Sequence, residues 1–139
     1  QKMKVAFDTN VILDFILHRP NAQAALELVR KVAAEEIGGI ISANSITDIY
    51  YIARKTIGDE KAREAVADLL ALFDVAPVDG DGCSKALATP MNDYEDAVLA
   101  VCSAQEGADY LVTRDEDFLA AEGCPVQVVS PGTLLEMLN

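Results

Sequence analysis

The chain alternates short apolar runs with longer segments in which apolar residues recur every three or four positions. Apolar runs bounded by turn residues predict buried strands. The predicted strands are residues 4–8, 40–41, 75–78, 109–112 and 126–129, with a turn at 79–82. The three-to-four spacing predicts amphipathic helices. The predicted helices are residues 11–17, 21–36, 59–73, 83–89, 94–105, 115–121 and 131–138. One more helix is predicted to follow the capping residues 42–45 and to end at Thr56.

Strands that alternate with helices predict a parallel sheet, because parallel strands need crossover connections and helices usually supply them. We therefore expect an α/β fold, a three-layer α/β/α sandwich with a mainly parallel sheet of about five strands. With an assumed strand order 3-2-1-4-5, the first and fourth strands are neighbours where the winding reverses. The length suits one core, so residues 3–139 are expected to form a single domain, preceded by an expression remnant at residues 1–2.

Composition narrows the function classes. The 139 residues carry a formal net charge of −12, which argues against a protein that coats nucleic acid through a general basic surface. No apolar stretch approaches the roughly 20 residues of a membrane-spanning helix, and no signal-peptide pattern opens the sequence, so a soluble cytoplasmic protein is expected. His18 is the only histidine, and the three cysteines lack metal-ligand spacing. This disfavours sites built on imidazole or thiolate groups.

Acidic residues stand at predicted strand ends and early in predicted helices. They are Asp8, Asp48, Asp93, Asp96, Asp115 and Asp117. Each one alone fits a structural role, because carboxylates cap helix N-termini and interact favourably with the helix dipole. Asn92 with Glu95, or Asp93 with Asp96, fits a capping box. On these grounds Asp8 is either a helix cap or a site residue.

Two observations favour a functional site. Asp96 is followed by an apolar stretch at residues 97–102, and a carboxylate in an element that favours burial needs a partner or an ion. Asp8 and Asp115 end strands that the assumed order makes neighbours. Gathered carboxylates repel one another unless cations neutralise them, and oxygen-only ligands select Mg²⁺ or Mn²⁺. A pair of such ions suits phosphodiester hydrolysis.

Four segments together resemble the PIN-domain family, which contains VapC-type ribonuclease toxins and their stand-alone relatives. They are DTNVILD at 8–14, SANSITDIYYIARK at 42–55, DYEDAV at 93–98 and YLVTRDEDF at 110–118. The resemblance covers residues 3–139. The catalytic residues that it implies are Asp8, Asp48, Asp96 and Asp115. The metal ligands that it implies for Mg²⁺ or Mn²⁺ are Asp8, Asp96, Asp115 and Asp117, with Asn10 and Thr113 as supporting residues.

The resemblance also implies an activity and partners. The activity is metal-dependent cleavage of single-stranded RNA, with a role as the toxin of a toxin–antitoxin pair. The partners are a second copy of the chain in a homodimer and a small antitoxin with a basic or amphipathic tail. Arg54, Lys55 and Arg114 are the predicted phosphate contacts, because they are the basic residues close in sequence to the acidic positions. Surface solvation explains Arg54 and Lys55 equally well.

Asp48 departs from the family pattern, in which the second acid is commonly Glu. Its side chain is one methylene shorter, and its helical phase directs it away from the apolar stripe of its helix and toward Tyr51 and Lys55. This departure, with the high net acidity, leaves open a second hypothesis about function. In that hypothesis the chain is a PIN-fold module with weak or absent catalysis that binds RNA or a protein partner.

Two other protein classes share part of this pattern: haloacid-dehalogenase-type phosphatases also begin with a strand that ends in Asp, and receiver-type signalling domains also cluster carboxylates. A haloacid-dehalogenase-type phosphatase needs a second acid where Asn10 stands. A receiver domain needs a lysine after the last strand, where residues 130–132 read Ser-Pro-Gly. Both classes are therefore disfavoured.

Overall fold

The computed structural model describes residues 2–20 and 22–139, and within them the chain forms five strands and eight helices. In chain order the elements are β1 (Lys4–Phe7), α1 (Thr9–Ile16), α2 (Gln23–Ala33), β2 (Gly38–Ser42), α3 (Ala43–Ile57), α4 (Asp59–Leu72), β3 (Asp74–Ala76), α5 (Gly80–Leu87), α6 (Tyr94–Gln105), β4 (Tyr110–Val112), α7 (Glu116–Leu119), β5 (Gln127–Val129) and α8 (Pro131–Leu138). Within these residues no helix has the length and apolar character needed to cross a bilayer.

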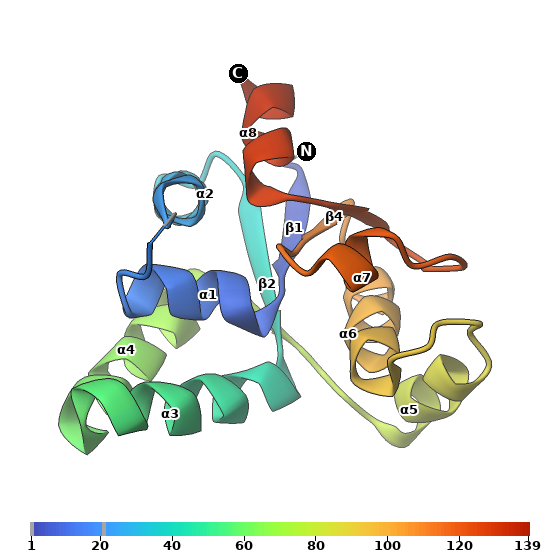
Figure 1. The fold of residues 1–139 in the computed structure, drawn as a ribbon, viewed down its shortest axis with the longest axis horizontal. Coiled ribbons are helices and arrows are strands. Elements are labelled where there is room, and N and C mark those ends of the chain that lie inside the picture. The colour runs from blue at the N-terminus through green and yellow to red at the C-terminus, as the bar shows by residue number, and fades with distance from the viewer. Residues whose placement is uncertain (1, 21) are drawn as a thin grey trace.

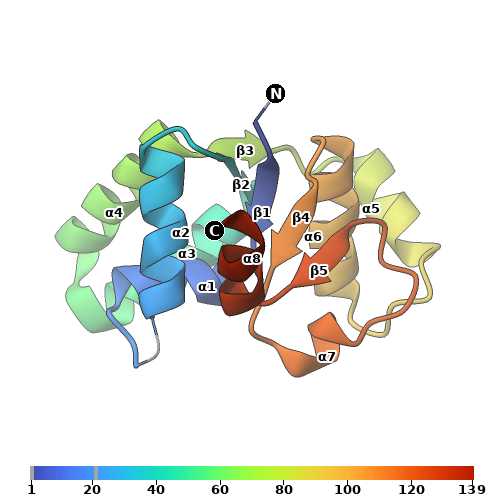
Figure 2. The same ribbon diagram turned by 90° about the horizontal axis from the view of Figure 1, so that it is seen from above.

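The five strands form one parallel sheet in the order β3-β2-β1-β4-β5. Figure 1 shows β1, β2 and β4, and Figure 2 also shows β3 and β5. β1 pairs with β2 on one side and with β4 on the other, where Phe7 stands opposite Val112. The predicted fold class and strand order are confirmed. The carboxyl ends of β1 and β4 consequently lie side by side at the point where the winding reverses, which is where open α/β sheets place their sites.

The sheet separates two cores, because successive side chains on a strand point to opposite faces. On β1, Val5 and Phe7 belong to the core that α1, α2, α3, α4 and α8 cover. Ala6 belongs to the opposite core, together with Leu99 of α6 and Phe118 of α7. Figure 2 shows α2 and α8 on one side of the sheet and α6 on the other. This is the predicted three-layer arrangement.

Close packing around β2 fixes the strand that leads into the site. A Cβ atom on Gly39 would lie 2.5 Å from the ring of Phe73, so only glycine admits the ring at this distance. The Phe73 ring meets the Phe7 ring edge to face, with 5.3 Å between centroids. Phe7 is the last residue of β1, so this packing holds the strand end from which the site begins.

Two element ends differ by three residues from the sequence-based predictions, whereas the others agree within two. The helix predicted over 21–36 ends at Ala33, and Glu35 has a φ of 61°, which a helix does not accommodate. Its predicted start at Asn21 lies outside the described residues, as does Gln1 of the predicted expression remnant.

The other such end is the start of α5. Residues 79–82, predicted as a turn, instead hold the first turn of this helix. Asp79 is the N-cap, and its side chain accepts a hydrogen bond from the backbone N–H of Gly82. β3 ends at Ala76 rather than at residue 78, because Pro77 has no N–H to donate to the sheet.

Candidate functional site

Asp8 directly follows β1 and takes two roles at once. Its Oδ1 accepts a hydrogen bond from the backbone N–H of Thr9 at 2.8 Å, which caps α1. Its Oδ2 accepts a hydrogen bond from Oγ1 of Thr113 at 2.7 Å. The backbone N–H of Asp8 donates to the carbonyl of Val112 at 3.0 Å, so the pairing of β1 with β4 sets the position of this carboxylate.

Thr113 links the ends of β1 and β4. Its fully buried hydroxyl donates to Asp8 and accepts a hydrogen bond from the backbone N–H of Asp115 at 3.1 Å. Asp115 in turn caps α7, where its Oδ1 accepts a hydrogen bond from the backbone N–H of Asp117 at 2.9 Å. The structure therefore brings Asp8 and Asp115 together through one hydroxyl group, with Thr113 in contact with both.

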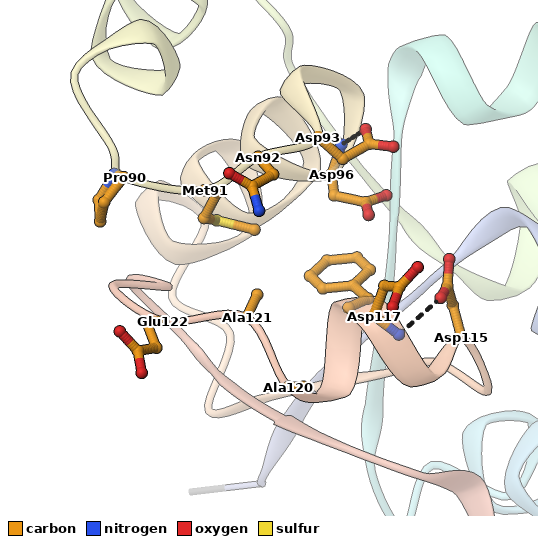
Figure 3. Close-up of a pocket in the computed structure, with 11 residues that line it drawn as sticks. Pro90, Met91, Asn92, Asp93, Asp96, Asp115, Asp117, Ala120, Ala121 and Glu122 are labelled. Carbon is orange, nitrogen blue, oxygen red and sulfur yellow. Dashed lines mark hydrogen bonds between the residues drawn. The ribbon is translucent and has the colours of Figure 1, made fainter.

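A cleft of about 820 Å³ opens beside Asp115, between the start of α6 and α7. Figure 3 shows Asp93 and Asp96 on one side of it and Asp115 and Asp117 on the other. Asp93 caps α6 by accepting a hydrogen bond from the backbone N–H of Asp96 at 3.0 Å. Of the two capping arrangements that the sequence allowed, the Asp93–Asp96 pair is the one present.

A smaller recess shares Asp96 with the cleft and brings in α3. It is lined by Asp8, Thr9, Asn44, Ser45, Asp48, Glu95, Asp96 and Leu99. Asp48 lies away from the apolar stripe of α3, and it nevertheless lines this recess together with Asp96 of α6. The reason lies in the start of α3, where Ser45 accepts a hydrogen bond from Oγ1 of Thr9 at 3.0 Å and anchors the helix beside the end of β1.

Glu95 is a site residue that the sequence analysis did not assign. It was considered only as a capping partner of Asn92, yet it lines the recess with Asp48. Burial raises the pKa of Glu95 above its ordinary value, and the charges of Asp48, Asp93 and Asp8 raise it further. The signal that could have revealed it is the acidic pair at residues 95–96, which opens a helix that is otherwise almost entirely apolar.

Burial and mutual repulsion raise the pKa values of the site carboxylates. Burial, followed by the charges of Asp93 and Asp8, raises the pKa of Asp96 to about 7. Burial also raises the pKa of Asp8, and the charge of Asp115 adds to the rise, whereas hydrogen bonds from Thr113 and Thr9 act in the opposite direction. The site therefore has a surplus of negative charge that a bound cation relieves.

The donor set consists of carboxylate, hydroxyl and amide oxygens, which fits Mg²⁺ or Mn²⁺ and not a soft metal. In the part of the chain that the structure describes, no three histidine, cysteine or acidic side chains already form a ligand group around one point. Binding of an ion here therefore requires some of the carboxylates to rotate toward it.

Arg54 and Lys55 do not join the acidic residues. Both are exposed near the C-terminal end of α3, and they lie roughly 9 to 10.5 Å along the helix axis from Asp48 at a rise of about 1.5 Å per residue. Neither lines the cleft or the recess, and the guanidinium of Arg54 lies 6.0 Å from the ring centroid of Tyr51. Because α3 runs away from the site, nearness in sequence does not place these two residues beside the acidic ones.

Arg114 also lines neither the cleft nor the recess, but it lies near the acidic residues, since its hydrogen bonds to Asp14 and then the charges of Asp8 and Asp115 raise its pKa. Its Nε and Nη2 donate to the two carboxylate oxygens of Asp14 at 2.7 and 3.2 Å. Asp14 is only 6% exposed and also accepts a hydrogen bond from Nη1 of Arg19 at 3.3 Å. Asn10 accepts from the same Arg19 nitrogen at 3.4 Å, so its contact is with an arginine and not with a site carboxylate. Asp14 was part of the DTNVILD segment but had no assigned role.

Comparisons with known proteins agree with this geometry. The family model described as PIN domain matches residues 4–117. A curated relative, Ribonuclease VapC1 of Aquifex aeolicus (strain VF5), is 26% identical over 142 residues, which cover 98% of this chain and 96% of that protein. The alignment therefore spans nearly the whole chain.

Solved structures share the fold at lower identity. VapC20 of Mycobacterium tuberculosis, described as a Sarcin-Ricin loop cleaving toxin, aligns with a TM-score of 0.68 at 18% identity over 88% of this chain and 98% of that chain. A toxin-antitoxin complex from Klebsiella pneumoniae contains a chain that aligns with a TM-score of 0.66 at 23% identity, over 91% of this chain and 97% of that chain.

Proposed function

The chain belongs to the PIN-domain family, and from this premise we propose that it is a ribonuclease that hydrolyses phosphodiester bonds of single-stranded RNA with Mg²⁺ or Mn²⁺. The observation that carries the proposal is the gathering of Asp8, Asp96 and Asp115 at the ends of β1 and β4 and the start of α6. A relative that aligns over almost the whole chain is named as a ribonuclease, which supports the same activity.

The residues that would hold the ions are Asp8, Asp96, Asp115 and Asp117. Their carboxylate oxygens are the ligands that hard divalent cations prefer. When bound, such ions supply Lewis-acid activation of the phosphate and a hydroxide nucleophile. The raised pKa of Asp96, to about 7 through burial and neighbouring acids, supports this role, because a cation would remove the repulsion that produces part of the rise.

The remaining site residues position these carboxylates and the RNA. The Thr113 hydroxyl and the Thr9 backbone N–H orient the two oxygens of Asp8. Asp48 extends the acidic wall on the side of α3. Arg114 provides a fixed cation beside Asp115, and we assign phosphate binding to it rather than to the distant basic pair at residues 54–55.

A protein partner belongs to the same proposal. A chain of a toxin-antitoxin complex has this fold, and we propose that the present chain is the toxin of such a pair and forms a homodimer. The formal net charge of −12 favours an antitoxin that presents a basic or amphipathic segment, since opposite charges steer association.

Ion binding and cleavage measured together test the proposal. Wild-type protein is expected to bind Mn²⁺ in calorimetry and to cleave single-stranded RNA in Mg²⁺ or Mn²⁺, and EDTA should stop cleavage. Asp115→Asn is expected to weaken Mn²⁺ binding and to lower cleavage on the order of 100-fold, although Asn remains a good helix cap. Asp68→Asn removes the same charge from an exposed position on α4 and should retain both properties.

A wild-type protein that binds Mn²⁺ but leaves a broad panel of RNAs intact would contradict the nuclease assignment. That outcome would favour a PIN-fold module that binds RNA or a partner protein without cleaving it. Equal ion binding by wild type and Asp115→Asn would contradict the assignment of the ligands.

A further inference from the structure

A buried carboxylate next to the acidic site gathers two arginines from distant parts of the chain. Asp14 of α1 is 6% exposed, and its oxygens form ion pairs with Arg19 at 3.3 Å and with Arg114 at 2.7 Å. Arg19 follows α1, whereas Arg114 stands in the loop between β4 and α7. Two guanidinium groups around one carboxylate leave this cluster with one net positive charge.

The contact with Asp14 occupies only one edge of the Arg114 guanidinium. Nε and Nη2 donate to the carboxylate, but a guanidinium carries five N–H groups in a planar fork. Nη1 and the second hydrogen of Nη2 form another edge, which matches the oxygens of a phosphate in a bidentate arrangement. The side chain of Arg114 is 54% exposed, so a ligand from solvent reaches it.

The position of Arg114 in the chain places its guanidinium next to the acidic site. Its neighbours in sequence are Thr113, which donates to Asp8, and Asp115, whose backbone N–H donates to Thr113. Asp14 holds the guanidinium through two hydrogen bonds, so the direction of this side chain beside the acidic residues is fixed.

We propose that Asp14 is a positioning residue that presents the second edge of Arg114 to a backbone phosphate of the RNA at the acidic site. Arg19 holds Asp14 from the other side, and its own contact with Asn10 at 3.4 Å extends the cluster along α1. The inference rests on the proposed ribonuclease function. It gives an anionic substrate a fixed cation on a chain whose net charge is −12.

Steady-state cleavage of a short fluorescein-labelled single-stranded RNA by Asp14→Asn tests whether Asp14 positions Arg114 for RNA or only links α1 to the β4–α7 loop. A phosphate contact made equally in the ground state and the transition state affects KM, so KM is expected to rise about tenfold while kcat stays within about twofold. A tie between α1 and the β4–α7 loop would instead lower the fraction of active protein, which reduces kcat and leaves KM unchanged.

The sign of the effect excludes a general electrostatic cause. Asp14→Asn removes one negative charge, and charge alone would strengthen RNA binding and lower KM. Asp68→Asn makes the same charge change on an exposed face of α4 and is the matched control. Its KM is expected to stay at the wild-type value or fall slightly.

Two substitutions of Arg114 itself keep the test valid if Asp14→Asn folds poorly, because this side chain is exposed. Arg114→Gln and Arg114→Lys are both expected to raise KM, since one ammonium group cannot serve Asp14 and a phosphate as a planar fork does. In EDTA, fluorescence anisotropy of the same RNA should show a log–log salt slope that is smaller by about 0.7 for Arg114→Gln and retained for Arg114→Lys.

Cleavage by wild type combined with an unchanged KM for Asp14→Asn and both Arg114 variants would overturn the positioning role while leaving the ribonuclease assignment intact. A wild type that cleaves no RNA would overturn the ribonuclease assignment. In that case the anisotropy measurement decides: weaker RNA binding by Asp14→Asn than by Asp68→Asn supports the positioned phosphate contact, and equal binding overturns it.

Discussion

Asp96 shows most clearly how burial and repulsion between carboxylates raise pKa values in the site. Its partial burial, then the charges of Asp93 and Asp8, raise its pKa to about 7. The pKa of Glu95 is raised as well, first by burial and then by Asp48. In the absence of a cation, the folded protein therefore holds these carboxylates at an energetic disadvantage relative to the unfolded chain.

Asp96→Asn is expected to stabilise the metal-free protein at neutral and higher pH. Because the folded-state pKa lies above the ordinary value of 3.8, this carboxyl group favours folding at low pH, and its contribution is lost as the pH rises to about 7. The substitution removes that loss. Solvent reaches the group, so screening limits the expected gain to about 1 to 2 kcal/mol.

Urea denaturation in EDTA measures this gain in the free energy of unfolding. We expect it near pH 8 and expect it to vanish at a pH well below 3.8, where the carboxyl group is protonated in both the folded and the unfolded state. Asp68→Asn should show little change at either pH. An equal gain for Asp96→Asn at both pH values would mean that charge repulsion is not its cause.

Single residues differed in how far the sequence revealed them. Asp8, Asp96 and Asp115 could be predicted as candidates because each stands near the beginning or end of an apolar run, which is a local signal. Asp14 was not found, because its role depends on Arg114, which lies 100 positions away in the chain. A contact of this kind is a product of the fold and leaves no local pattern.

At the scale of elements, apolar periodicity was sufficient to predict each strand and helix, whereas the strand order that the structure shows had been assumed. The largest errors at element ends came from local geometry that periodicity does not contain, such as the side-chain cap of Asp79 and the positive φ of Glu35. The periodicity of α3 correctly set Asp48 apart from the apolar stripe. Periodicity did not show that Asp48 lies in one recess with Asp96 of α6. That proximity depends on how α3 and α6 are placed around β1.

The helix α1 positions both the acidic and the cationic groups of the site. Asp8 caps its N-terminus and belongs to the acidic cluster. Asp14, six residues further along, binds both arginines. Because α1 begins directly after the central strand β1 (Figure 1), the rigid sheet fixes the spacing between the carboxylates and the cationic cluster.

At the scale of the whole molecule, the net charge of −12 has consequences for binding. A strongly acidic surface repels RNA except where cations are held, and it attracts basic protein segments. We expect purification from the native host, followed by mass spectrometry, to yield a small protein with a basic or amphipathic segment bound to this chain. Sedimentation equilibrium of the isolated chain should give a dimer.

A chain recovered from its host without a bound protein, and monomeric in sedimentation, would contradict the toxin–antitoxin part of the proposal. The nuclease assignment would survive that result, since the acidic cluster lies within a single copy of the chain. The chain would then be a stand-alone PIN-domain nuclease.

The most direct test of the central claim compares RNA cleavage and thermal unfolding of wild type and Asp8→Asn. Asn caps helices as well as Asp does, so the Tm is expected to be unchanged or slightly higher, because burial and the charge of Asp115 raise the pKa of Asp8 in the folded state. Cleavage in Mg²⁺ or Mn²⁺ is expected to fall at least about 100-fold, the scale of a lost electrostatic catalytic group. Cleavage by Asp8→Asn at the wild-type rate would show that Asp8 is only a helix cap and would contradict the account.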